Sequence, residues 1–294
     1  MEKFTSGSHE IILKRIRDIP SLPDVVNRIL AVISKPNTPA SEIAKLISYD
    51  PGLTSKVLRM VNSAAYGFQR QISSIQHGIM ILGFNNVRGL VLSASIFKLF
   101  EGHTHPGGLN HQQFWEHSLG TAVAARLLAT SLRIHEADDV FSAAMLHDIG
   151  KVVLDVYFKE DYHLVLKQAG QQRMVMHGKP FCQLENAVLG LTHTDIGSYL
   201  AAKWKLPVGI TEVIQYHHTP ENAEHCGPMV YLVALANELA VLQYEKQGVY
   251  DPAHISPNLR EYFDLDDERL QFFLSALKTE MDSAQDLLNA ISTR

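Results

Sequence analysis

Apolar residues recur every three or four positions along almost the whole chain, which is the spacing of amphipathic helices. The clearest cases, each with a broad apolar face, are the segments 21–34, 38–48 and 50–62. Thr38 and Asp50 each precede a proline and are expected to cap the helices that follow. Gly83 is expected to end the apolar helix before it. No alternating run is long enough to indicate a strand, so the pattern predicts an all-α fold.

The segment EGHTHPGGLNHQQ, residues 101–113, interrupts the helical pattern with glycine, proline, asparagine and histidine. This composition is typical of a linker or a long loop between helices. We therefore divide the chain into a helical N-terminal lobe, residues 1–105, packed on a larger helical domain, residues 106–294. The three histidines of the segment are interpreted as part of a solvated polar loop.

The N-terminal lobe is interpreted as a docking or dimerisation platform, because its helices bury apolar faces and carry no cluster of candidate ligands. The acidic C-terminal segment, residues 264–292, contains one or two amphipathic helices. These helices are expected to cap the second domain or to pair with another subunit, as in a homodimer.

Composition limits the classes of protein to consider. The 294 residues are 46% hydrophobic, enough for a large core, and the net charge of −5 gives no electrostatic case for nucleic-acid binding. Two cysteines, Cys182 and Cys226, cannot form a disulfide framework, which favours a reducing cytosol. The N-terminal residues do not form a signal peptide, and no apolar stretch is long enough to span a bilayer. We therefore expect a cytoplasmic protein without a membrane partner.

Histidines stand within or at the ends of apolar segments in the second part of the chain. His117 lies in FWEHSLGTAVAARLL, and AAMLHDIGK contains His147, Asp148 and Lys151. Lys151 follows His147 by four residues, which places both on one helix face. Taken alone, His117 is interpreted as a hydrogen-bonded core residue, and the other three are equally consistent with a local ion-pair cluster.

Three more histidines occupy expected helix ends. His193 opens the helical segment HTDIGSYLAAKW, and Gly197 one turn later permits the close approach of another helix or a ligand. His217 and His218 end an apolar helix before a proline, where the helix dipole favours partial positive charge. Each of these residues has a structural explanation when it is considered alone.

The whole set points to a metal centre. Six nitrogen or oxygen donors are available, namely His117, His147, Asp148, His193, His217 and His218. Imidazole with carboxylate suits iron, manganese, zinc or nickel, and six donors exceed what one tetrahedral zinc ion needs. They fit two divalent ions that share Asp148, an arrangement that activates water against a phosphate ester. Lys151 would then stabilise charge on the phosphate.

The motif HDIGK, with one histidine upstream and three downstream, resembles the HD superfamily of metal-dependent phosphohydrolases. The segments LPDVVNRILAVI, ASEIAKLISYDPGLTSKVLRMVNSAAYG and ISSIQHGIMILGFNNVRGLVL closely resemble the HDOD domain, the HD-related output domain of bacterial signalling proteins. This resemblance implies an all-helical fold, the bacterial cytoplasm and a role in signal transduction or regulation. It does not imply a defined catalytic activity.

The resemblance extends to single residues. His117 matches the first histidine of the HD pattern, and His147 with Asp148 matches the doublet. Lys151 matches the lysine of the related HD-GYP phosphodiesterases, and His193 resembles their next histidine. The pair His217 and His218 resembles their histidine pair.

The departures from the pattern concern activity. Asn237 stands where the final aspartate of the HD pattern is expected, so one ligand loses its charge. The glycine-tyrosine-proline segment of the HD-GYP group is absent after His218, and Gln113 stands where an acidic residue would extend the site to a third metal. These departures argue against cyclic-di-GMP hydrolysis and leave metal binding in place.

Three functions follow. The favoured one is a regulatory protein whose centre binds a divalent metal, expected to be dinuclear iron or manganese with zinc or nickel as alternatives, together with a small phosphorylated ligand, and which acts on a signalling partner. The second is a phosphohydrolase of nucleotides or cyclic dinucleotides, with Asp148 and Lys151 as its catalytic residues. The third is a metal-free interaction scaffold.

Overall fold

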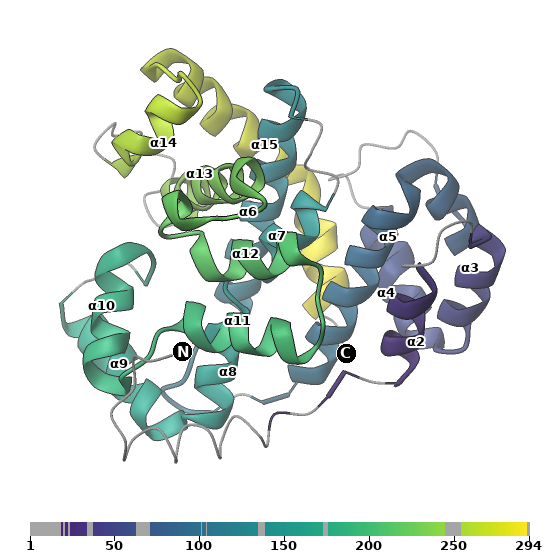
Figure 1. The fold of residues 1–294 in the computed structure, drawn as a ribbon, viewed down its shortest axis with the longest axis horizontal. Coiled ribbons are helices and arrows are strands. Elements are labelled where there is room, and N and C mark those ends of the chain that lie inside the picture. The colour runs from purple at the N-terminus through teal and green to yellow at the C-terminus, as the bar shows by residue number, and fades with distance from the viewer. Residues whose placement is uncertain are drawn as a thin grey trace.

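The computed structural model describes residues 19, 21–22, 24–33, 38–62, 71–100, 102–103, 105–134, 139–172, 176–244 and 254–292. These residues form helices and no strand, which confirms the all-α prediction (Figure 1). The helices are α2 (Asp24–Ile33), α3 (Ala40–Ser48), α4 (Pro51–Val61), α5 (Ile75–Phe100), α6 (His111–Ser131), α7 (Val140–Leu146), α8 (Ile149–Tyr157), α9 (Lys159–Gln171), α10 (Gly178–Leu189), α11 (His193–Lys203), α12 (Val208–Tyr216), the 3₁₀ helix η2 (Pro220–Asn222), α13 (Gly227–Tyr244), α14 (Pro257–Tyr262) and α15 (Asp267–Ser292).

The N-terminal lobe, at the right of Figure 1, consists of α2, α3 and α4 packed against α5. Asp50 caps α4 as predicted, because its carboxylate accepts a hydrogen bond of 3.0 Å from the Leu53 amide. The prediction for Thr38 was wrong. Its hydroxyl donates to the Val32 carbonyl at 2.8 Å, and Pro39 occupies the N-cap position of α3 without a side-chain bond. Proline has no side-chain acceptor, so the first turn of α3 has no side-chain cap.

Helix α5 joins the two parts of the molecule. Gly83 interrupts it with non-helical dihedral angles (φ 80°, ψ 168°), as expected for a residue that ends a helix. After this break α5 runs against α7, and the two backbones approach so closely that a Cβ on Gly89 would lie 1.5 Å from the Ser142 hydroxyl. An ion pair between Arg88 and Asp139 fixes the same junction.

Helix α6 is the centre of the second part and is buried along most of its length. It packs against α7, α13 and α15, while α15 also reaches α4 in the N-terminal lobe. One continuous hydrophobic core therefore includes residues on both sides of position 105. The C-terminal helix covers both parts of the chain, and the division at residues 105 and 106 stays a prediction.

Part of the connection between the lobes is docked against α8, while most of its other described residues are exposed. Helix α6 begins at His111, so the loop is shorter than predicted. His105 and His111 each place Nε2 3.2 Å from a carboxylate oxygen of Asp155 in α8, and the Leu109 amide donates to that carboxylate at 2.8 Å. The interpretation of a solvated loop was wrong for these two histidines, because the buried Asp155 needs hydrogen-bond donors; only His103 is exposed.

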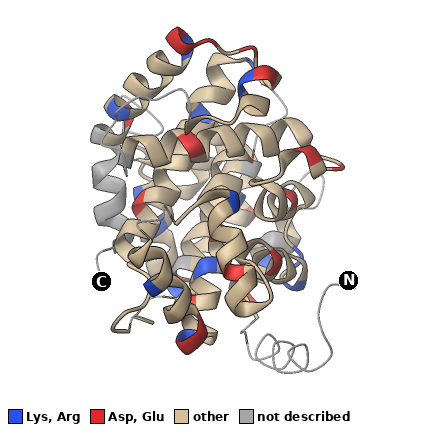
Figure 2. Ribbon diagram, turned by 90° about the vertical axis from the view of Figure 1, so that its left-hand side faces the viewer, with Lys and Arg blue, Asp and Glu red and all other residues tan. Residues whose placement is uncertain are grey.

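The distribution of charged residues agrees with the small net charge of −5. Basic and acidic residues are interspersed over the described helices in the view of Figure 2. Within the described part of the chain, no single helix is both long enough and apolar enough to cross a membrane, and the two bent halves of α5 reach that composition only when they are taken together.

Two glycines set the distance between α8 and α11. A Cβ on Gly150 would lie 1.8 Å from the His193 carbonyl oxygen, and a Cβ on Gly197 would lie 2.7 Å from Ile214 and 3.3 Å from the Gly150 amide nitrogen. The close approach expected at Gly197 is therefore made by α8 and α12. It brings the first turn of α8 next to the first turn of α11.

We expect Gly150→Ala to lower the free energy of unfolding by about 1–3 kcal/mol, because the new methyl group overlaps a backbone carbonyl that cannot move independently. Gly170→Ala is the matched control. Gly170 lies within α9 with no atom near its missing Cβ, so the same substitution should stabilise the protein by about 0.5–1 kcal/mol. Urea denaturation measures both values, and equal effects would contradict this account of the packing.

Candidate metal centre

Asp148 lies in the turn between α7 and α8, because the His147–Asp148 pair ends one helix and begins the next. Its side chain has 0% exposure, and α7, with every residue buried, holds it inside the core. A carboxylate so completely removed from water is costly unless cations or hydrogen-bond donors surround it. The surrounding groups come from four other segments of the chain.

Each oxygen of Asp148 faces its own set of imidazoles. Oδ2 lies 3.3 Å from Nε2 of His147 and 3.8 Å from Nε2 of His117, which projects from α6. Oδ1 lies 3.2 Å from Nε2 of His193 at the start of α11 and 3.4 Å from Nε2 of His217 at the end of α12. The carboxylate therefore separates two groups of nitrogen donors.

His218 belongs to the second group. One ligand atom from each of His193, His217, His218 and Asp148 lies within 4.8 Å of the others, and the same holds for His117, His147 and Asp148. The structure thus brings together all six donors singled out from the sequence. Two coordination sets that share Asp148 are the arrangement a dinuclear centre requires.

Backbone acceptors orient the rings. His147 Nδ1 donates to the Ala144 carbonyl at 2.7 Å, and His217 Nδ1 donates to the Val213 carbonyl at 3.0 Å. Carbonyl oxygens only accept, so the proton of each neutral ring is on Nδ1 and the lone pair is on Nε2. In both cases the lone pair is directed at Asp148.

Glu185 orients His193 in the same way and was missed in the sequence analysis. Its buried carboxylate accepts from His193 Nδ1 at 2.6 Å and from the His193 backbone amide at 2.9 Å. Carboxylates behind ligating histidines fix the tautomer and increase ring basicity. Glu185 lies eight residues before His193, in the preceding helix α10, and this spacing alone does not indicate a contact.

The orphaned atoms fit a bound cation. Asp148 Oδ1 and the Nε2 atoms of His147, His193, His217 and His218 are buried, and none has a hydrogen-bond partner within the described part of the chain. Nitrogen lone pairs and a carboxylate oxygen that face one another at 3.2–3.4 Å repel unless positive charge lies among them. The residues present therefore fit a metal.

Burial keeps most of these rings neutral, as metal ligands must be. It lowers the pKa of His217 to about 4 and the pKa values of His117 and His218 well below the ordinary value. Burial alone would raise the pKa of Asp148, but His147 and Lys151 hold it well below its ordinary value. For His193, burial lowers the pKa and the neighbouring Glu185 outweighs it, so the net shift is upward.

Lys151 is held beside Asp148. Its ammonium donates to Asp148 Oδ2 at 2.6 Å and to the Met176 carbonyl at 2.8 Å, and it lies 3.2 Å from Nδ1 of His177. His177 was also missed in the sequence analysis, because it precedes α10 and belongs to no apolar helix. Its ring lies 3.9 Å from the ring of His117, between centroids, and covers that side of the centre.

Asn237 contacts the centre, while Gln113 does not. Asn237 is buried in α13, and its proximity to His117 opposes the lowering of the His117 pKa by burial. Its Oδ1 has no partner among the described residues. Gln113 is exposed in the first turn of α6. The residue at the position of the expected aspartate is therefore close to the ligands, and its amide is neutral.

Comparison with known proteins gives a consistent picture. A family model for the HDOD domain matches residues 19–220. A crystal structure of an HDOD domain protein with unknown function from Geobacter sulfurreducens is 26% identical, with a TM-score of 0.70, over 96% of this chain and 98% of that chain. An uncharacterized protein from Treponema pallidum is 27% identical over 228 residues, which are 77% of this chain and 43% of that protein. This chain therefore spans less than half the length of the curated relative.

Two more distant crystal structures share the fold. A candidate phosphohydrolase from Shewanella amazonensis is 20% identical, with a TM-score of 0.72, over 96% of this chain and 98% of that chain. A candidate signal transduction protein from Marinobacter aquaeolei is 20% identical, with a TM-score of 0.75, over 97% of this chain and 66% of that chain.

Acid should destabilise the metal-free protein. His117, His177, His217 and His218 have lowered pKa values when folded, so below pH 6.5 the unfolded chain binds more protons than the folded chain. Their contribution is present above that pH and is lost as the pH falls toward 4, by up to about 1.4 kcal/mol per pH unit for each histidine. The raised pKa of His193 offsets part of this loss.

Urea denaturation in a chelator, at about pH 7.5 and about pH 5.5, measures the effect. The variant His218→Gln lacks one of these imidazoles, so its free energy of unfolding should fall less between the two conditions. Equal stability of the unmodified chain at both pH values would contradict the assignment of neutral buried rings.

Glu185→Gln should weaken divalent metal binding by about 10- to 100-fold, because the amide no longer supplies the charge that fixes and polarises His193. Competition with a chromogenic chelator measures the affinity. Glu160→Gln, an exposed carboxylate in the first turn of α9, is the matched control and should leave metal binding unchanged. An unchanged affinity in Glu185→Gln would show that this carboxylate does not support the centre.

Proposed function

The chain belongs to the HDOD family, and on this premise we propose that it is a regulatory protein whose buried His/Asp centre binds two divalent metal ions and, through them, a small phosphorylated ligand. The observation that carries the proposal is the pair of donor groups around the two oxygens of Asp148, with lone pairs directed inward from fixed rings. Such a centre has no use in a purely structural helical scaffold.

Iron or manganese suits the donors best, since imidazole nitrogen and carboxylate oxygen are supplied without thiolate. Zinc and nickel are the alternatives. His117 and His147 with Asp148 would hold one ion, and His193, His217 and His218 with Asp148 would hold the other. Bound metal ions supply positive charge for a phosphate and lower the pKa of water.

The chain's own residues favour binding over turnover. Lys151 adds a fixed positive charge, but its ammonium is already held by Asp148 and the Met176 carbonyl, so it acts on a ligand at a distance. Asn237 supplies neither the negative charge nor the proton acceptor that an aspartate would supply there. A centre with two divalent cations and one carboxylate ligand would hold an anionic phosphate strongly.

A metal-dependent phosphohydrolase is the second candidate. The observation that favours it is that both oxygens of Asp148 retain a complete set of imidazoles. In that case Asp148 and Lys151 are the catalytic residues proposed from the sequence, acting on nucleotides or cyclic dinucleotides. The segment after His218 lacks the glycine-tyrosine-proline motif, which disfavours a cyclic dinucleotide.

In the regulatory function another molecule recognises the chain when metal and ligand are bound. A signalling partner, or a second copy of the chain in a homodimer, would contact the helical surface, and the bacterial cytoplasm is the expected location. The curated relative is more than twice as long as the part matched here, so such a partner domain can also be joined to the HDOD unit in one polypeptide.

The test begins with metal analysis of protein produced with iron and manganese, for which we expect about two ions per chain, and hydrolysis of bis(p-nitrophenyl) phosphate. Asn237→Asp should increase metal affinity about tenfold, because it adds a charged ligand next to His117. If Asn237 limits catalysis, the variant also raises hydrolysis. Asn222→Asp, the same change at an exposed site, is the matched control.

Asp148→Ala should abolish metal binding, since it removes the oxygen atoms that both donor groups share. Absence of metal from the unmodified protein would overturn the proposal in favour of the scaffold. Rapid hydrolysis by the unmodified protein that is lost in Asp148→Ala would replace it with the phosphohydrolase.

A further inference from the structure

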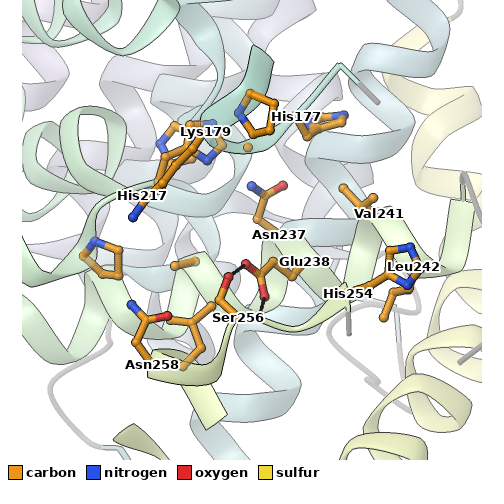
Figure 3. A pocket seen from close by; sticks show the side chains of 16 residues that line it. His177, Lys179, His217, Asn237, Glu238, Val241, Leu242, His254, Ser256 and Asn258 are labelled. Atoms are coloured by element: carbon orange, nitrogen blue, oxygen red, sulfur yellow. Dashed lines mark hydrogen bonds between the residues drawn. The ribbon is translucent and has the colours of Figure 1, made fainter. Parts of the chain in front are cut away.

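A cavity of about 440 Å³ opens beside the candidate metal centre (Figure 3). It is lined by the start of α10, the residues that follow α12, helix α13 and the segment that leads into α14. His217 and His218 form part of its wall, so a molecule in the cavity can reach the second group of donors directly. Among the six donors, these two line the cavity. Its far wall, which includes Glu238, Val241 and Leu242, has no part in the proposed metal centre.

Asn237 stands between the donors and the rest of the cavity. In Figure 3 its amide lies in the middle of the labelled side chains, between His177 and the Glu238–Ser256 pair. Asn237 is 3% exposed and its Oδ1 has no partner within the described part of the chain. A buried oxygen of this kind is costly unless a donor from a ligand or a metal satisfies it.

The wall away from the metal centre has a polar part and an apolar part. Glu238 accepts from the Ser256 amide at 2.8 Å and from the Ser256 hydroxyl at 2.5 Å. A carboxylate has about four acceptor positions, so this pair leaves about two for another donor. Val241 and Leu242, one turn further along α13, add apolar surface beside it.

Charge and size then define the ligand. Metal ions favour a phosphate at one end, and Lys179 at the rim adds a positive charge that it shares with Glu221 at 3.4 Å. Glu238 favours a neutral or positive donor group at the other end. A volume of about 440 Å³ lies toward the low end of the range for small-molecule sites, about 300–1,000 Å³. It fits one nucleotide or sugar phosphate better than a cyclic dinucleotide, which contains two nucleotides.

We propose that this cavity binds a phosphomonoester of single-nucleotide size, with its phosphate at the metal centre and a hydrogen-bond donor of its organic group on Glu238. The inference rests on the proposed function, because it requires metal ions to hold the phosphate. Glu238 is then the residue that determines specificity. A phosphate ester without a donor group binds less tightly at the same centre.

Isothermal titration of the manganese-loaded full chain tests the proposal with five probes, namely inorganic phosphate, phenyl phosphate, guanosine 5′-monophosphate, glucose 6-phosphate and cyclic di-GMP. At least one of the donor-bearing monophosphates should bind about tenfold more tightly than phenyl phosphate. The two monophosphates distinguish a base donor from sugar hydroxyls. Cyclic di-GMP should bind more weakly than the preferred monophosphate.

Glu238→Gln should remove this tenfold preference, because the single amide oxygen has only two lone pairs, as many as the two donors of Ser256 require, and leaves none for the ligand. Binding of inorganic phosphate should be unchanged, since phosphate does not reach this wall. Val241→Phe fills the cavity away from the metal ligands, so it should exclude the organic group and keep the affinity for inorganic phosphate and the metal content. Circular dichroism melting shows whether each variant is folded.

The outcomes distinguish a failure of the proposed function from a failure of this inference alone. If the metal-loaded chain does not bind inorganic phosphate, the proposed function fails and this inference fails with it. If phosphate binds but neither monophosphate exceeds phenyl phosphate, or both folded variants keep the preference, only the inference is overturned. Tighter binding of cyclic di-GMP than of either monophosphate also overturns it.

Discussion

The structure depends on the burial of one carboxylate, that of Asp148, among imidazole nitrogens whose lone pairs also carry partial negative charge. Nitrogen atoms of five imidazole rings lie within 3.8 Å of the Asp148 oxygens. Hydrogen bonds on the far side of three of these rings turn their lone pairs inward. Without positive charge this arrangement is unfavourable, and Lys151 reaches only one oxygen of Asp148. Five helices begin, end or pass at this point, namely α6, α7, α8, α11 and α12. The second part is therefore packed around a site whose side chains do not supply all the positive charge that it needs.

The helix termini do part of the work that metal sites usually assign to carboxylates. His147 and His217 are the C-cap residues of α7 and α12, and each ring donates to a carbonyl in the last turn of its own helix. Each of those carbonyls also accepts from the backbone amide of the same histidine, so the ring occupies its second acceptor position. One side chain therefore satisfies the end of a helix and presents a ligand atom. Only His193 requires a separate carboxylate, because it begins a helix, where amides and not carbonyls are free.

The sequence predicted the helical class and the six donors because both are local signals. Periodicity shows which face of a helix is buried, and a histidine or aspartate on that face is conspicuous. Glu185 and His177 escaped notice because a glutamate and a histidine in polar surroundings are ordinary until a tertiary contact is known. The same limit explains Thr38, whose hydroxyl has an acceptor in a neighbouring helix, and the histidines bound to Asp155, which were interpreted as solvated.

The attachment at Asp155 has a mechanical consequence. Asp155 lies seven residues after Asp148, about two turns along α8, and it fastens the crossover between the lobes through His105, Leu109 and His111. Helix α8 therefore begins directly after Asp148 and, two turns later, binds the chain that arrives from the N-terminal lobe. A shift of α8 along its axis would move this connection as well. A change at the buried carboxylate is in this way mechanically coupled to the connection between the lobes.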